Sequence, residues 1–215
     1  MALVDTDVSV NYDLVNLAQA SARTGKRLTG EQRREHLLEV AAEILADQGF
    51  DAVTMEAVRE RAGVSRGLTY THFVNAEELI YALYERERAV LDGRLEEACA
   101  NVETFDGRIR AAARAYFDFV SDRGSLFAML QVKLIDRWSK ASVKARLSRL
   151  FKYWSDEIEK ELGVSREQAA SLSRASLAAS EALISAWRAR HITRDEAERM
   201  CVDFVLGGLR NVQRP

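Results

Sequence analysis

One stretch, from Thr54 to Phe73, constrains the fold of this chain more than any other part of the sequence. It contains two short segments of helical periodicity on either side of Gly63. A hinge between two such helices needs a small residue at the end of the first helix, a glycine that accepts positive φ, and an apolar residue directly afterwards. Ala62, Gly63 and Val64 meet these needs. The stretch predicts a helix-turn-helix, whose second helix is suited to the major groove of DNA.

Hydroxyl side chains stand at the expected starts of both helices. Thr54 is placed to cap the first helix and Ser65 to cap the second. The second helix then begins with Ser65, Arg66 and Gly67 exposed at its positive end, an arrangement that favours phosphate.

The run from about Glu31 to Glu78 resembles the DNA-binding domain of the tetracycline-repressor (TetR) family. Two positions depart from the family pattern: Thr69 stands where an apolar residue normally precedes the tyrosine, and Ala76 stands where a lysine normally touches phosphate. The resemblance covers about the first third of the chain and rests on matches at Asp47-Gln48-Gly49-Phe50, Thr54, Ala62-Gly63-Val64-Ser65-Arg66-Gly67, Tyr70, His72, Phe73 and Glu77.

The resemblance implies an all-α protein with a three-helix DNA-binding head and a larger C-terminal domain that binds a ligand and dimerises. We expect an N-terminal extension over 1–28, the head over 29–75 and the larger domain over 76–215. The implied function is that of a ligand-responsive transcriptional regulator, a repressor that binds a palindromic operator as a homodimer and is released by a small apolar effector. An activator or an architectural DNA binder would have the same signature.

Positions within the head suggest a role for each DNA-facing residue. Thr54, Tyr70 and His72 are expected to face phosphates, Arg66 and Leu68 to face bases, and Arg33 to face the backbone. The complete set of expected contacts is Arg33, Thr54, Ser65, Arg66, Gly67, Leu68, Thr69, Tyr70 and His72.

The charge of the chain is unevenly spread. The formal net charge is −2 over 215 residues, yet five basic residues stand against one acid between Arg23 and Arg34. Such a run is usually a solvated face, but directly before a helix-turn-helix it favours contact with phosphates or a minor groove. The basic side chains are Arg23, Lys26, Arg27, Arg33 and Arg34.

Composition favours helices along the whole chain. There is one proline, Pro215, and there are no alternating β-branched runs. No apolar run is long enough for a membrane span, and the acidic start does not resemble a signal peptide, so we expect a cytoplasmic protein. Cys99 and Cys201 have no metal-binding spacing with each other or with the three histidines, and neither metal nor cofactor is expected.

Capping boxes and glycines predict nine helices, or ten if residues 1–22 form one rather than a frayed terminus. The first predicted helix runs from Gly30 to Gln48, and a long helix opened by Asn75 and Glu78 continues toward Cys99. The C-terminal helices are expected at 107–122, 125–136, 140–162, 165–190 and 194–211.

Large apolar side chains crowd the C-terminal part. Most belong to a core, but the resemblance implies that some enclose an effector cavity, with polar ends drawn from Arg114, Asp118, Lys133, Asp136 and Arg137. The pocket candidates are Tyr116, Phe119, Phe127, Leu130, Trp138, Phe151, Trp154 and Trp187. The last two helices, rich in small residues and apolar on a wide face, are expected to pair with those of a second copy.

A rival hypothesis from another class is a hydrolase. Gly63-Val64-Ser65-Arg66-Gly67 matches G-x-S-x-G, in which Ser65 would be the nucleophile. That motif needs a buried strand before the serine, whereas the preceding residues are charged and have helical periodicity. The hydrolase reading is therefore a remote alternative, and no catalytic residue is expected.

Overall fold

The computed structural model describes residues 28–137 and 148–212, and all regular elements in these ranges are helical. The all-α fold class is confirmed. The chain divides into two units, Met1–Leu83 and Tyr84–Pro215. The predicted boundaries at 28/29 and 75/76 remain predictions. None of the described helices is both long and apolar enough to cross a membrane.

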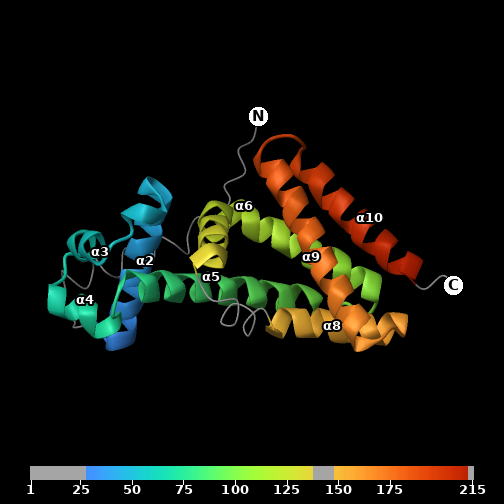
Figure 1. The fold of residues 1–215 in the computed structure, drawn as a ribbon, viewed down its shortest axis with the longest axis horizontal. Helices are drawn as coiled ribbons and strands as arrows, with labels where there is room; N and C mark the ends of the chain where they lie inside the picture. The colour runs from blue at the N-terminus through green and yellow to red at the C-terminus, as the bar shows by residue number, and fades with distance from the viewer. Residues whose placement is uncertain (1–27, 138–147, 213–215) are drawn as a thin grey trace. The chain divides into compact units, whose positions relative to one another are not determined.

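The first unit holds the short helices and begins with α2 (Gly30–Gln48), whose predicted bounds are confirmed. Thr29 Oγ1 accepts a hydrogen bond from the Gln32 amide at 3.2 Å, and Gln32 Oε1 accepts one from the Thr29 amide at 3.0 Å. The other elements are η1 (Phe50–Ala52), α3 (Met55–Ala62), α4 (Arg66–His72) and the first turns of α5 (Ala76–Cys99) (Figure 1).

The core of the first unit comes from the apolar stripe of α2 and from residues that close over it. Arg61 of α3 pairs with Asp47 of α2 at 3.1 Å, and the Arg34 guanidinium lies over the Phe73 ring, 5.0 Å from its centre. These contacts hold α3 and the end of α4 against α2. The buried residues include Leu37, Leu38, Ala41, Ile44, Leu45, Val53, Val58, Phe73, Leu79, Ile80 and Leu83.

The second unit contains the rest of α5 together with α6 (Phe105–Arg137), α8 (Ser148–Leu162), α9 (Arg166–Arg188) and α10 (Arg194–Val212). Figure 1 shows α9 and α10 side by side as an antiparallel pair joined by a short loop. The predicted capping boxes at their starts are confirmed. Ser165 Oγ accepts from the Gln168 amide at 3.3 Å, and Thr193 Oγ1 accepts from the Glu196 amide at 3.2 Å.

The break predicted between residues 122 and 125 is wrong, because α6 is one helix from Phe105 to Arg137. A glycine inside a helix costs only about 1 kcal/mol relative to alanine and does not end the helix by itself. Gly124 therefore continues α6. The described residues accordingly hold eight α-helices and one short 3-10 helix, instead of the nine α-helices predicted.

Several predictions concern residues outside the described ranges. These are the extension over 1–27, the basic residues Arg23, Lys26 and Arg27, the start of the helix predicted over 140–162, and Trp138.

Candidate DNA-binding surface and effector cavity

The turn between α3 and α4 has the geometry that its sequence predicts. Gly63 has φ 65° and ψ 31°, the left-handed conformation that glycine adopts without strain. Its amide hydrogen-bonds to the Glu60 carbonyl at 3.2 Å, and the Val64 amide bonds to the Arg59 carbonyl at 3.2 Å. These bonds end α3 and turn the chain into α4.

Side-chain caps open both helices of the motif. Thr54 Oγ1 accepts from the Ala57 amide at 3.1 Å, and Ser65 Oγ accepts from the Leu68 amide at 3.3 Å. Ser65 thus follows a helix and caps another one, and the described residues contain no strand. The strand-turn-helix context of a hydrolase nucleophile is missing around Ser65.

The exposed side of α4 is formed by Arg66, Gly67 and Tyr70, while Leu68 and His72 are half-buried. The Arg66 guanidinium carbon lies 5.5 Å from the centre of the Tyr70 ring, one turn further along the helix. A Cβ at Gly67 would meet no atom within 4 Å, so the backbone there is open to close approach. This side of α4 presents a cation, an aromatic ring and bare backbone.

Thr69 does not lie on the exposed side of α4. Its side chain is only 1% exposed, and its hydroxyl lies 3.4 Å from the Ser65 carbonyl oxygen, to which it donates. In the resembled family this position is normally apolar. Here it holds a threonine whose hydroxyl is hydrogen-bonded to the backbone one turn earlier. Because Thr69 is buried, it cannot contact DNA in this conformation and is not part of the proposed interface.

The other expected DNA contacts lie outside α4. Thr54 is exposed and Arg33 half-exposed. Ala76 is the first residue of α5, where Asn75 Oδ1 accepts from the Glu78 amide at 2.8 Å and Glu78 Oε2 accepts from the Val74 amide at 2.6 Å. The Asn75 half of the predicted capping box is present, but Glu78 reaches the Val74 amide instead of the Asn75 amide. The two bonds fix the backbone next to Ala76.

The second unit encloses a cavity of about 120 Å³ between α5, α6, α8, α9 and α10. Three of the predicted pocket residues, Tyr116, Phe151 and Trp154, line it. Most of the remaining wall is aliphatic. The other lining residues are Arg88, Leu91, Leu95, Ile109, Ala112, Ala113, Ile158, Ser173, Ser176, Leu177, Ser180, Cys201 and Val205.

The remaining predicted pocket residues that the structure describes are not on the cavity wall. Phe119, Phe127 and Leu130 are core residues, and the Phe119 and Phe127 rings pack edge to face at 5.2 Å. Trp187 stacks on Phe117 with ring centres 5.7 Å apart.

The predicted polar ends lie elsewhere as well. Arg114 and Asp118 line a separate polar groove on α6 and α10, where Asp118 pairs with Arg194. Lys133, Asp136 and Arg137 belong to the part of α6 whose side chains are not described.

The cavity wall contributed by α5 was missed from the sequence. Arg88, Leu91 and Leu95 share one face of that helix, at spacings of three and four residues. The small residues of α9 are predicted to face a second copy of the chain. Three of them, Ser173, Ser176 and Ser180, instead line the cavity. An amphipathic pattern does not show whether the buried face of a helix packs against a filled core or lines a cavity.

Polar groups are few on the wall. Burial raises the pKa of the Tyr116 hydroxyl well above its usual range, and Glu181 adds to the effect, so the phenol stays protonated. Burial also raises the pKa of the Cys201 thiol, whose sulfur lies 3.2 Å from Ser180 Oγ. A cavity of this kind suits an apolar molecule with a small polar group.

Exposed apolar and small side chains lie along both α9 and α10. Phe204 is 65% exposed and Met200 is 46% exposed. On α9, small side chains form an exposed stripe at helical spacing, which consists of Ala175, Ala178, Ala182 and Ser185. We call these six residues the α9–α10 face.

Comparison with known proteins agrees with the geometry of both units. The family model described as bacterial regulatory proteins, tetR family, matches residues 37–83. The transcriptional activator FasR of Mycolicibacterium smegmatis is 29% identical over 194 residues, which cover 88% of this chain and 89% of that protein. The fatty acid metabolism regulator protein of Bacillus subtilis is 21% identical over 54% of this chain and 59% of its own length.

A solved structure shows the same fold along most of the chain. The TetR-like transcriptional regulator from Rhodococcus sp. RHA1 superposes with a TM-score of 0.68 at 21% identity, over 86% of this chain and 99% of that one. With the helix-turn-helix and the helical second unit, these findings show a TetR-family DNA-binding domain at residues 37–83, in a chain with the fold and sequence relatives of ligand-responsive, DNA-binding transcriptional regulators.

Proposed function

We propose that the protein is a homodimeric repressor that acts in the cytoplasm, binds a palindromic operator and is released by a small apolar effector. The observation that carries the proposal is that one chain contains both an exposed recognition helix and an apolar cavity. A protein in which an effector site is coupled to a DNA-binding site is a regulator, and residues 28–137 and 148–212 contain no strand that could carry a catalytic nucleophile.

The proposed DNA interface consists of the described residues on the open side of the helix-turn-helix. Arg66 is proposed to contact a base, because a guanidinium forms two hydrogen bonds with guanine. Leu68 is proposed to contact a base through its apolar side chain. Phosphate or backbone contacts are assigned to Arg33, Thr54, Tyr70 and His72, with Ser65 and Gly67 supplying the closely approaching backbone.

The proposed dimer interface is the α9–α10 face. An exposed phenylalanine and methionine on α10 and an exposed stripe of small side chains on α9 present surface that a second helix pair would cover. Two copies joined by this face form a four-helix bundle. The two-fold symmetry of such a dimer requires an operator with two symmetric half-sites, spaced near one helical turn of about 34 to 36 Å or a multiple of it.

The proposed effector is an apolar molecule that occupies the cavity lined by Tyr116, Phe151 and Trp154. The name of the Bacillus subtilis relative points to fatty acid metabolism, so fatty acids and their thioesters are the first compounds to test. The effector must bind one conformation of the protein more tightly than the other to change DNA affinity.

Selection of duplexes from a random-sequence pool tests the proposal directly. The full chain should enrich a sequence with two-fold symmetry, and a protein without specific DNA binding would enrich none. An activator is the second candidate, since the Mycolicibacterium smegmatis relative has that name. Mapping the enriched sequence relative to a promoter separates the two, because a repressor site overlaps the promoter and an activator site lies upstream of it.

A further inference from the structure

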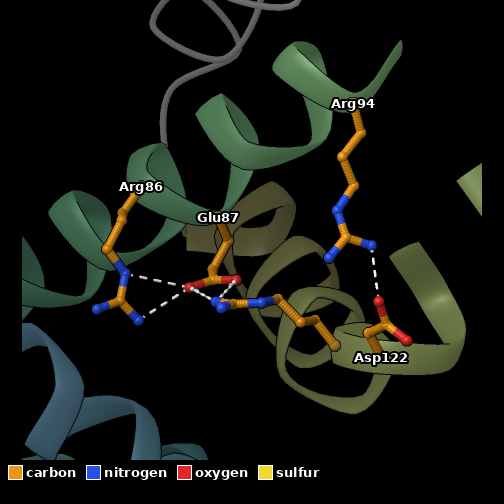
Figure 2. Close-up of polar contacts among 5 residues, drawn as sticks. Arg86, Glu87, Arg94 and Asp122 are labelled. Atoms are coloured by element: carbon orange, nitrogen blue, oxygen red, sulfur yellow. Dashed lines mark hydrogen bonds and ion pairs between the residues drawn. The ribbon is translucent and has the colours of Figure 1, made fainter. Parts of the chain in front are cut away.

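A carboxylate is buried between α5 and α6 in the second unit. Glu87 of α5 is 0% exposed and accepts hydrogen bonds from two arginines (Figure 2). Arg123 of α6 donates to both carboxylate oxygens, at 3.0 and 3.1 Å. Arg86 donates through Nε at 3.1 Å and through Nη2 at 2.9 Å. A carboxylate removed from water is tolerated only when it is paired and hydrogen-bonded in this way.

Stability alone does not explain a charged group at this place. An apolar side chain of similar volume would usually serve a core as well or better, because the desolvation of a buried ion pair offsets much of its Coulomb attraction. Leu91 and Leu95, one and two turns further along α5, belong to the apolar core of this unit. Unlike an apolar contact, the ion pair is directional: the two hydrogen bonds that Arg123 donates to Glu87 join α6 to α5 and form at only one relative position of the two helices.

A second ion pair lies two turns further along α5. Arg94 Nη1 lies 2.8 Å from Asp122 Oδ2 of α6, and Figure 2 shows this pair beside the first one. Asp122 is next to Arg123 in sequence, so the two side chains leave α6 in different directions. Unlike the Glu87 pair, the Arg94–Asp122 pair is partly exposed on both sides, and it provides a comparison for the buried pair.

The position of α5 matters because this helix belongs to both units. It begins at Ala76, three residues after Phe73, the C-cap of α4, and it continues without a break to Cys99. Along the way Arg88, Leu91 and Leu95 form the α5 wall of the cavity. Glu87 is therefore next in sequence to a residue that an effector would touch.

We propose that Glu87, bound to Arg123 of α6 and further neutralised by Arg86, is a positioning residue that keeps α5 at one position on α6 and thereby sets the DNA affinity of the ligand-free protein. The three residues together are called the Glu87 latch. This inference rests on the proposed function, because DNA affinity is what the latch controls. Without the latch, α5 takes several positions of similar free energy, and the DNA-binding arrangement is only one of them.

The test compares full-length Glu87→Gln with wild type on the enriched duplex and on a random duplex. The substitution preserves shape and removes the charge that both arginines neutralise. The dissociation constant for the enriched duplex should rise at least about fivefold, the lower end of typical couplings between sites. The random duplex should respond less, because non-specific binding depends on phosphate contacts and not on the placement of two heads.

Asp122→Asn is the matched control. It removes an α5–α6 ion pair whose two side chains are 35% and 56% exposed. Exposed pairs contribute little, so this variant should bind the enriched duplex within about twofold of wild type. Circular dichroism and light scattering establish that both variants are helical and have the assembly state of wild type. All titrations are done well below the unfolding midpoint of each variant.

A purely structural ion pair predicts a different result. It would lower the unfolding temperature of Glu87→Gln and leave the ratio of specific to random DNA affinity unchanged, and that outcome overturns the proposal. If Glu87→Gln does not fold, Arg123→Met takes its place, since methionine has a long unbranched side chain but cannot donate to the carboxylate. Wild-type DNA affinity in folded Arg123→Met likewise overturns it. Failure of the wild-type chain to enrich any duplex refutes the proposed function and the latch together.

Discussion

The guanidinium of Arg66 lies over the ring of Tyr70, with its central carbon 5.5 Å from the ring centre. The two residues are one helical turn apart on the exposed side of α4. A cation held over an aromatic face keeps fewer rotamers, so Arg66 is partly oriented before it meets DNA. Preorganisation of this kind lowers the entropy lost on binding.

We expect Arg66→Ala to weaken binding to the enriched duplex by about 1 to 3 kcal/mol, the range for loss of a two-bond contact to guanine. Binding to random DNA should weaken less. Titration of both duplexes at one salt concentration measures the difference. Arg61→Ala is the control, because Arg61 of α3 pairs with Asp47 and is not part of the proposed interface. Equal weakening on both duplexes would make Arg66 a phosphate contact.

The helix-turn-helix could be predicted from sequence because local chemistry determines it. Thr54 and Ser65 cap the two helices, and Gly63 provides the positive φ, so each boundary depends on one or two residues. Thr69 differs from the sequence-based expectation. A polar residue within an exposed motif is expected to face outward, yet Thr69 is buried and its hydroxyl donates to the Ser65 carbonyl.

The second unit was less predictable because its details depend on packing between distant segments. Gly124 resembles a helix stop, but α6 is continuous through it, because one glycine costs a helix only about 1 kcal/mol. The cavity also has no local signature. Tyr116 and Trp154 line it while the equally apolar Phe119 fills the core, and only the relative placement of five helices separates these roles. The sequence alone does not distinguish the buried Glu87 from the many glutamates that face solvent.

Substitutions on the α9–α10 face test the dimer. Leu206 is buried inside its own unit, so a charge there would disturb folding before assembly. Phe204 is mostly exposed, and Phe204→Asp should yield a folded monomer with reduced operator affinity. Light scattering reports the mass, and Asp203→Ala on the neighbouring exposed position is the control. A dimer that survives both Phe204→Asp and Ala178→Arg would place the interface on another surface.

Trp154 lines the cavity, whereas Trp187 is stacked against Phe117 away from it. An effector that enters the cavity should therefore change the tryptophan fluorescence of wild type, and most of the change should disappear in Trp154→Phe. The same compound should lower the affinity for the enriched duplex. A ligand that binds the DNA-competent and incompetent forms equally shifts nothing, so fluorescence change without loss of DNA affinity would contradict the coupling.

Ala76 starts α5 at a backbone fixed by Asn75 and Glu78, and a lysine normally touches phosphate at this position in the resembled family. If the proposed interface extends to the start of α5, Ala76→Lys adds one phosphate contact per subunit. Each neutralised phosphate contributes about −0.9 to the slope of log affinity against log salt, so the slope of a dimer should steepen by roughly two. The added contact should tighten binding about equally on the enriched and random duplexes, because phosphates carry no sequence information.

Ala76→Gln, which has a long side chain without charge, separates the charge effect from any change in the helix cap. A slope equal to that of wild type would place the start of α5 away from the phosphates and leave Arg33 and its basic neighbours as the main electrostatic contacts.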